Sequence, residues 1–186
     1  MQLLDSVIIA KGWLGLTFSK DGKYLYASGG NDNWIMRYQI NNNKIVPHDT
    51  LVFGKPWPVK ISIAGIAVDD KQQLLYTVTK EDNSLYVYDL KAKKIKKQIQ
   101  LDGEGYTCLL SNDNKTLYVS CWGCDKVVVF DTEKQQVSGF IPVGDNPNDL
   151  CISRNGKYLF VSNANDNSVS VISTEKNRVI EILNSA

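Results

Sequence analysis

The chain has 186 residues, of which 43% are hydrophobic and 22% are charged, and its formal net charge is +1. This composition is that of an ordinary globular domain, and so small a net charge gives no whole-chain attraction to nucleic acid or to an acidic membrane. No run of about 18 apolar residues occurs, so we expect no membrane-spanning helix. The opening residues, MQLLDSVIIAKGW, have no basic region followed by a long apolar run, so we expect no signal peptide in them.

Four segments of the chain align with one another without gaps. They begin at Gly15, Gly65, Thr107 and Asp149 and read GLTFSKDGKYLYAS, GIAVDDKQQLLYTV, TCLLSNDNKTLYVS and DLCISRNGKYLFVS. The aromatic residue near the end of each falls at Tyr26, Tyr76, Tyr118 and Phe160, which gives steps of 50, 42 and 42 residues. A repeat of this period predicts a series of similar structural units, the first of which carries an insertion.

In chain order, the first predicted element is a strand at residues 3–10, LLDSVIIA. Four units of four strands each follow, at about 14–53, 63–101, 106–143 and 148–184. Within each unit, short runs rich in Val, Ile, Tyr and Leu are separated by Asp, Asn, Gly and Lys, which is typical of strands and turns. The sequences KDGK (20–23) and RNGK (154–157) favour tight hairpin turns.

An antiparallel four-stranded unit every 40-odd residues is typical of a β-propeller blade. Strands such as KVVVF (126–130) are apolar on both faces, as expected for a sheet that lies between two others. We therefore predict an all-β fold, with residues 1–186 forming a single segment of four blades plus an extra N-terminal strand. A solenoid or a sandwich is the alternative.

The number of strands bears on whether the ring closes. The last blade already has its own outermost strand at 178–183, so the strand at 3–10 is not needed to complete it. We predict a partial, open piece of a larger propeller, and a closed four-bladed ring is the alternative. Because an open piece exposes apolar blade faces, we expect two copies to associate and cover them.

Two units, GKYLFVSNANDNSVSVISTEKNRVIEI and KTLYVSCWGCDKVVVFDTEKQQVSGFIPVGDNP, resemble the YVTN family of bacterial β-propellers, which includes YncE-like and surface-layer-associated proteins. KGWLGLTFSKDGKYLYASGGNDN and GKPWPVKISIAGIAVDD are similar to the propeller half of bacterial proteins that join a YncE-like propeller to a phosphoesterase. The resemblance implies an exported protein, in the periplasm or at the cell surface, and a seven-bladed ring. It implies no catalytic residue here.

In a propeller, the loops between blades and the loops between the second and third strands of each blade gather at one end of the channel. Loops on a rigid frame tolerate functional residues, so this end is the predicted ligand site. The candidate ligand-binding residues are Trp13, Asn31, Asp32, Lys55, Trp57, Lys60, Asp82, Tyr106, Trp122, Asn146 and Asp166. Trp57 lies in the insertion between two prolines, and plugging of the channel mouth is its alternative role.

Three aspartates, Asp32, Asp82 and Asp166, recur at one repeat position with asparagine beside each. Convergent oxygens of this kind could bind Ca²⁺, but Asp-Asn pairs also stabilise turns, and repetition favours the turn role. We predict no metal and no cofactor. Cys121 and Cys124 have a CxxC spacing that allows a disulfide, a weaker zinc site or unreactive thiols. Cys108 and Cys151 are expected in the core.

The leading functional expectation is a non-enzymatic binding or scaffold propeller segment, whose ligand or protein partner is unknown. The alternatives are a propeller lactonase-type metal-assisted hydrolase and the accessory propeller of a phosphoesterase. A third is nucleic-acid binding by the lysines of KAKKIKK (91–97), although lysines there also protect an exposed sheet edge. The only histidine, His48, is expected far from the loops, which argues against nucleophile–histidine–acid catalysis.

Overall fold

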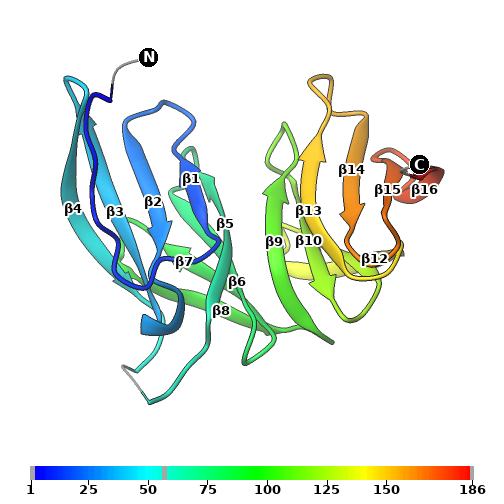
Figure 1. Cartoon of the computed structure of the whole chain (residues 1–186), viewed down its shortest axis with the longest axis horizontal. Coiled ribbons are helices and arrows are strands. Elements are labelled where there is room, and N and C mark those ends of the chain that lie inside the picture. The colour runs from blue at the N-terminus through cyan, green and yellow to red at the C-terminus, as the bar shows by residue number, and fades with distance from the viewer. Residues whose placement is uncertain (1–2, 56–57, 185–186) are drawn as a thin grey trace.

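The computed structural model describes residues 3–55 and 58–184 and consists of four antiparallel four-stranded sheets (Figure 1). The strands are β1 (Leu16–Phe18), β2 (Tyr24–Ser28), β3 (Trp34–Asn41), β4 (Lys44–Val52), β5 (Ile63–Asp69), β6 (Leu74–Thr79), β7 (Ser84–Asp89), β8 (Lys94–Gln100), β9 (Glu104–Leu110), β10 (Thr116–Trp122), β11 (Lys126–Asp131), β12 (Gln136–Pro142), β13 (Pro147–Ile152), β14 (Tyr158–Asn163), β15 (Ser168–Ser173) and β16 (Arg178–Asn184). A 3-10 turn, η1 (Gly30–Asp32), follows β2. The predicted all-β fold of four blades is confirmed.

Each blade is a simple meander in which consecutive strands pair. The turns between the first and second strands use the chemistry that the sequence predicts. In the first blade, the Ser19 hydroxyl donates to Asp21 Oδ1 over 2.7 Å, and Gly22 has a φ of 71°, which suits glycine. Gly156 has a φ of 72° at the same place in the fourth blade. These turns fix the register that places the repeated aromatics on one face.

The hydrophobic core is divided into layers between neighbouring blades. One layer, which contains Tyr26 and Tyr86, joins the first blade to the second. A second contains Tyr76 and Phe130 and joins the second blade to the third, and a third layer around Tyr118 joins the third to the fourth. Every blade is therefore held by apolar contacts with its neighbours, and this explains why the central strands are apolar on both faces.

The four blades do not close into a ring. In the described residues, no strand of the first blade pairs with the fourth, and β4 and β16 lie at opposite sides of the molecule (Figure 1). The predicted open, partial propeller is confirmed.

The N-terminal segment corrects one prediction. Residues 3–10 form no strand; they run in an extended path along the outer face of the first blade. Val7 and Ile9 pack beside Leu25 and Tyr38, and Asp5 Oδ2 accepts a hydrogen bond from Ile45 N over 2.8 Å. The segment lies on the face of a sheet, where no strand edge offers it a ladder of backbone hydrogen bonds, so it packs through side chains.

The innermost strands β1, β5, β9 and β13 stand side by side around the axis, with the other strands outside them. In the described part of the chain, no helix has the length and apolar character needed to cross a bilayer.

Candidate functional site

The loops between blades and the loops after the second strand of each blade meet at one end of the molecule, as the meander requires. Lys11 Nζ lies 2.7 Å from Asp32 Oδ1, and the Ser62 hydroxyl donates to Asn31 Oδ1 over 2.9 Å. In the third and fourth blades, Gly123 N donates to Asn146 Oδ1 over 2.8 Å. These contacts between loops of neighbouring blades build a continuous surface, which we call the loop face.

An aromatic row crosses the centre of the loop face. The ring centroids of Trp13 and Tyr106 are 5.9 Å apart with an interplanar angle of 84°, and those of Tyr106 and Trp122 are 5.7 Å apart at 51°. Trp13 precedes the first blade, whereas Tyr106 lies on β9 and Trp122 ends β10. Trp13 therefore reaches the third blade although it lies far from Tyr106 in sequence, whereas Tyr106 and Trp122 are neighbours on paired strands of one sheet. Trp13 is 49% exposed, and Tyr106 and Trp122 are half-buried.

A charged pair lies beside the row. Lys80 Nζ lies 4.5 Å from the ring centroid of Trp122, within the range of a cation–π contact, and 3.2 Å from Glu104 Oε2. Lys80 follows β6 of the second blade, so three blades contribute to this cluster. Neither Lys80 nor Glu104 is among the residues that the sequence predicts for the site. Glu104 pairs with Trp122 across β9 and β10, whereas the closeness of Lys80 to Trp122 depends on how neighbouring blades pack.

Two hollows adjoin the aromatic row. One, of about 360 Å³, follows the axis and is lined by residues of all four blades, among them Leu14, Ile66, Tyr106 and Asn148. The other, of about 400 Å³, lies between Trp13, Ser62 and Lys80. Aromatic faces, a cation, a carboxylate and amide groups therefore surround space of the size that a small ring-shaped ligand needs.

The insertion between the first two blades is held by Asn33, which sequence reasoning missed. Its side-chain Nδ2 donates to Lys55 O over 2.7 Å and to Val59 O over 2.5 Å, and its Oδ1 accepts from Ile61 N over 2.9 Å. Asn33 is fully buried and has a φ of 60°, a backbone region that asparagine tolerates. Lys55 and Lys60 are exposed beside it. The predicted residue Trp57 lies outside the described residues.

The recurring aspartates do not converge on a common point. Asp82 accepts hydrogen bonds from Tyr86 over 2.6 Å and from Thr79, both close to it in the same blade. Asp166 Oδ2 accepts from Asp145 N over 2.6 Å, and Asp32 pairs with Lys11. Asp82 therefore stabilises its own blade, whereas Asp32 and Asp166 each bind the loop that precedes their blade. Among residues 3–55 and 58–184, no three His, Cys, Asp or Glu side chains are grouped to hold a metal ion.

The four cysteines are free, so the possible Cys121–Cys124 disulfide is not formed. Cys121 is the second-to-last residue of β10, and its side chain lies in the core between the second and third blades. The thiol of Cys124 lies instead beside Asp102 O, at 3.5 Å, because the turn between the two residues directs it towards the neighbouring loop. Cys108 is buried as predicted, whereas Cys151 is exposed, because no further sheet in residues 3–55 and 58–184 covers the face of the fourth blade on which it lies.

These positions predict how the thiols react. Burial, with a smaller effect of the nearby Cys124, raises the pKa of Cys121 to about 12, and burial also raises that of Cys108. We expect a soluble disulfide reagent at pH 8 to modify Cys151 first, and Cys108 and Cys121 only after unfolding in urea. Mass spectrometry of peptides at successive times measures the order. Rapid modification of Cys121 in the folded protein would contradict its placement.

Two other predicted features lie away from the loop face. The lysines of 91–97 occupy the turn before β8 and the outermost strand itself, where Lys93 Nζ lies 3.2 Å from Asp49 Oδ2 of the first blade. His48 lies on the outermost strand of the first blade, its ring 5.3 Å from that of Tyr24. Neither feature contributes to the aromatic row.

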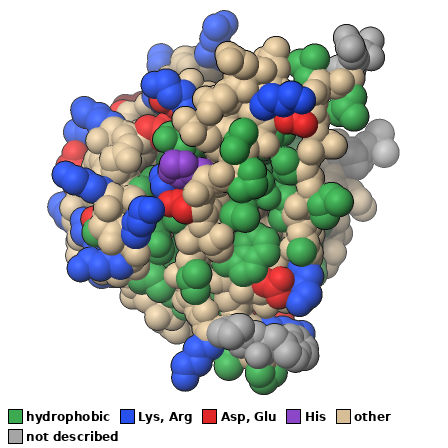
Figure 2. Space-filling view, turned by 90° about the vertical axis from the view of Figure 1, so that its left-hand side faces the viewer, with side chains coloured by type: hydrophobic (Ala, Val, Ile, Leu, Met, Phe, Trp, Pro, Cys, Tyr) green, Lys and Arg blue, Asp and Glu red, His purple; other side chains and the backbone are tan. Residues whose placement is uncertain are grey.

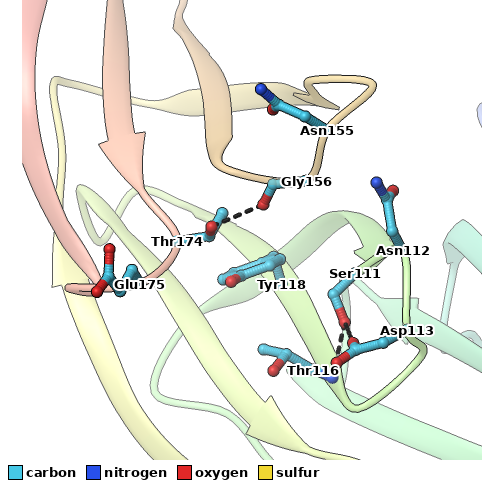
Figure 3. Close-up of a pocket in the computed structure, with 9 residues that line it drawn as sticks. All are labelled: Ser111, Asn112, Asp113, Thr116, Tyr118, Asn155, Gly156, Thr174 and Glu175. Carbon is cyan, nitrogen blue, oxygen red and sulfur yellow. Dashed lines mark hydrogen bonds between the residues drawn. The ribbon is translucent and has the colours of Figure 1, made fainter.

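A second polar pocket, of about 350 Å³, lies at the opposite end of the third and fourth blades (Figure 3). Its walls are turns whose polar groups bond to each other. The Ser111 hydroxyl donates to Asp113 Oδ1 over 2.6 Å, and Thr174 Oγ1 donates to Gly156 O over 2.7 Å. Since these contacts repeat the hairpin chemistry of other blades, we attribute the pocket to the packing of turns.

Comparisons with known proteins agree on the fold. Residues 100–179 match the family described as Lactonase, 7-bladed beta-propeller. Antigen Lp49 of Leptospira interrogans is 32% identical over 73% of this chain and 33% of its own length. The chain is therefore similar to propeller proteins, but it spans only about a third of this curated relative.

Solved structures extend the comparison. Hydrazine synthase of Kuenenia stuttgartiensis superposes with a TM-score of 0.80 and 25% identity, covering 91% of this chain and 48% of that one. A candidate 6-phosphogluconolactonase from Bacteroides uniformis gives a TM-score of 0.74 at 20% identity, over 91% of this chain and 52% of the other. The latter likeness concerns the fold alone. In both cases the four blades correspond to about half of a longer chain.

Proposed function

We propose that this chain is a non-enzymatic binding module whose ligand lies against the aromatic row Trp13–Tyr106–Trp122 on the loop face. The observation that carries the proposal is the contact of Trp13 with the Tyr106–Trp122 pair of the third blade, with ring centroids 5.9 and 5.7 Å apart. Partly exposed aromatics held by a rigid sheet frame bind flat ligand faces at low entropic cost. No other part of the described loop face combines three such rings with an adjoining hollow.

The expected ligand is a small ring compound with polar edges, such as a sugar unit or a nucleobase. The rings supply stacking surfaces, while Lys80, Glu104 and Asn148 supply groups that can hydrogen-bond to ligand hydroxyls or carbonyls. The Lys80 ammonium is already paired with Glu104, so the site has little net charge to attract a highly charged ligand. This balance favours a neutral or singly charged compound.

Replacing Tyr106 with alanine is expected to lower the affinity for such a ligand by about tenfold to a hundredfold, because a stacked ring contributes about 1–3 kcal/mol to binding. Binding of a panel of neutral oligosaccharides and nucleosides is measured through the fluorescence of the tryptophans. Tyr158→Ala, which removes an equally polar aromatic that is 40% exposed on the fourth blade, is the matched control. Unchanged affinity in Tyr106→Ala would rule out the aromatic row as the site.

Hydrolysis of a sugar lactone is the second candidate function, because residues 100–179 match a lactonase propeller family. These residues belong to the third and fourth blades and include Tyr106 and Trp122. A metal site built from His, Cys, Asp and Glu side chains is not supported, since the described residues hold no group of three or more of them. Acid release from a gluconolactone, followed at constant pH, distinguishes the two candidates: turnover above the uncatalysed rate favours the enzyme.

The exported location and the pairing with a phosphoesterase, both implied by family resemblance, remain part of the proposal. The comparisons support a role for the chain within something larger, because its four blades correspond to about half of each solved chain. Cell fractionation followed by detection with an antibody against the loop face tests the location. Recovery only from the cytosol would contradict it.

A further inference from the structure

The outer face of the fourth blade carries side chains that the other blades bury against a neighbour. Phe160 lies at the repeat position of Tyr26, Tyr76 and Tyr118, which are 1%, 0% and 2% exposed because the next blade covers each. Phe160 is only half-buried, and no sheet follows it. Val171 lies directly opposite Phe160 in the register and is 6% exposed, so Phe160 is the more accessible apolar group of this pair.

A serine hydroxyl on the same face of the fourth blade is the second feature that suits contact with another blade. The Ser28 hydroxyl donates to Ile63 O of the second blade over 2.7 Å, and the Ser120 hydroxyl donates to Asn148 O of the fourth blade over 3.1 Å. Ser162 occupies the same repeat position in the fourth blade. Among the described residues, its Oγ bonds to the N and O of Asp149 in its own blade, at 3.0 and 3.5 Å. The aromatic ring that joins each blade to the next, and the hydroxyl that does so in the first and third blades, are therefore both present on a face that no other sheet of the described residues covers.

The opposite face of the molecule carries the complementary half of such a contact. Leu16 lies at the repeat position of Ile66, Cys108 and Leu150, which are only 7%, 5% and 8% exposed because they pack against the preceding blade. Leu16 itself is 63% exposed. Figure 2 shows hydrophobic side chains gathered on this side of the molecule. Residues 3–10 cover another part of the face, around Leu25 and Tyr38.

We propose that two copies of this chain associate head to tail, with the outer face of the fourth blade of each packed against the first blade of the other. The two faces are the two halves of the contact that the chain itself makes three times, so a second copy is the partner that they fit. Such contacts form a closed ring when the rotation closes, and eight blades lie within the range that propellers use. Residues 3–10 must leave the first blade for the contact to form.

The association would also complete the site at the axis. The hollow beside Tyr106 is lined by residues at the inner strands of all four blades, including Leu16 of the first blade and Asp149 of the fourth. In the head-to-tail pair, the strand that contains Leu16 of the second copy lies next to the fourth blade. Trp13 of that copy, three residues earlier, then comes close to the loops of the first copy's fourth blade.

Light scattering after gel filtration over a wide concentration range tests the association. We expect a mass of twice 20.8 kDa at high concentration for the wild type, and a monomer for Phe160→Asp, which places a charge at the centre of the contact. Phe140→Asp is the control, because Phe140 is 64% exposed on the outermost strand of the third blade, away from both faces. A wild-type monomer at every concentration, or a dimer in Phe160→Asp, would overturn the proposal.

Cross-linking tests the orientation independently of any destabilised variant. Cys151 lies opposite Phe160 in the register and is exposed on the proposed contact face. With Leu16→Cys, a short bismaleimide is expected to join Cys151 of one copy to position 16 of the other, as identified by peptide mass spectrometry. A link only between two Cys151 residues would show a different pairing and would contradict the head-to-tail arrangement.

Discussion

Tyr76→Ala is expected to lower the free energy of unfolding by about 4 kcal/mol, because it removes a fully buried aromatic ring from the layer between the second and third blades. The ring packs edge-on against Phe130, with centroids 6.2 Å apart at 67°. The decrease in the free energy of unfolding has two causes: the burial of the ring is lost, and a cavity remains between the two sheets. Urea unfolding followed by circular dichroism measures it.

Tyr76→Phe is expected to behave in the opposite way. Within the described residues the buried Tyr76 hydroxyl has no hydrogen-bond partner, so its removal eliminates a desolvation cost of about 1–3 kcal/mol. Burial, and to a smaller degree Asp69, raises the pKa of Tyr76 to about 12, so the hydroxyl stays neutral at ordinary pH. We expect Tyr76→Phe to be as stable as the wild type or more so. A loss above about 1 kcal/mol would show that the hydroxyl is satisfied.

Asp49→Asn is expected to lower the free energy of unfolding by about 3 kcal/mol at pH 7, because it leaves the buried Arg37 guanidinium without its counter-charge. Arg37 Nε and Nη2 donate to Asp49 Oδ1 and Oδ2, each over 2.7 Å, and the two residues are direct cross-strand neighbours on β3 and β4. Lys93 of the second blade reaches the same carboxylate at 3.2 Å. The pair therefore also links two blades.

The loss of stability in Asp49→Asn is expected to depend on pH. Burial disfavours the charged form of Asp49, but hydrogen bonds from Arg37 and Lys93 outweigh it, and the pKa lies below its ordinary value of 3.8. A lowered folded pKa means that the stabilisation is complete above the unfolded pKa and disappears as the pH falls through the folded pKa. The difference between wild type and Asp49→Asn should therefore be constant from pH 7 to about 5 and shrink below about 4.

The matched control is an exposed pair. Lys115 and Glu133 lie 3.5 Å apart and their side chains are 64% and 63% exposed, so Glu133→Gln is expected to change the free energy of unfolding by about 0.5 kcal/mol or less. Unfolding in urea at pH 7, 5 and 3 compares the two variants. Equal effects of Asp49→Asn and Glu133→Gln at pH 7 would show that the buried ion pair does not stabilise the contact between blades.

Much of the candidate site could be predicted, but only as a set of loops. Trp13, Tyr106 and Trp122 were selected because they lie in loops that a propeller gathers at one end. Tyr106 and Trp122 lie on paired strands of the third blade, but the contact of Trp13 with Tyr106 depends on the distance and angle between blades, which no local pattern encodes. Lys80 illustrates the same limit, because its sequence neighbours indicate only a polar turn, whereas its position over Trp122 results from the packing of the second blade beside the third.

Incorrect or incomplete predictions have a common physical origin. Residues 3–10 have the composition of a strand, but a strand forms only where an edge offers a hydrogen-bonding partner, and the segment meets a sheet face instead. Cys121 and Cys124 have a spacing that permits a disulfide, but their turn directs one thiol into the core and the other towards Asp102 O. Cys151 was expected in a core that requires a fifth blade.

The repeat by itself determined the four blades, their strands and their hairpin turns, because alternation and turn chemistry act between residues close in sequence. It also placed Phe160 and Ser162 at positions whose counterparts lie between blades. Only the tertiary structure decided which of those positions are covered, how the three aromatic rings meet, and where each thiol lies. These features depend on contacts between blades 42 or 50 residues apart, and such contacts exist only once neighbouring sheets are in place.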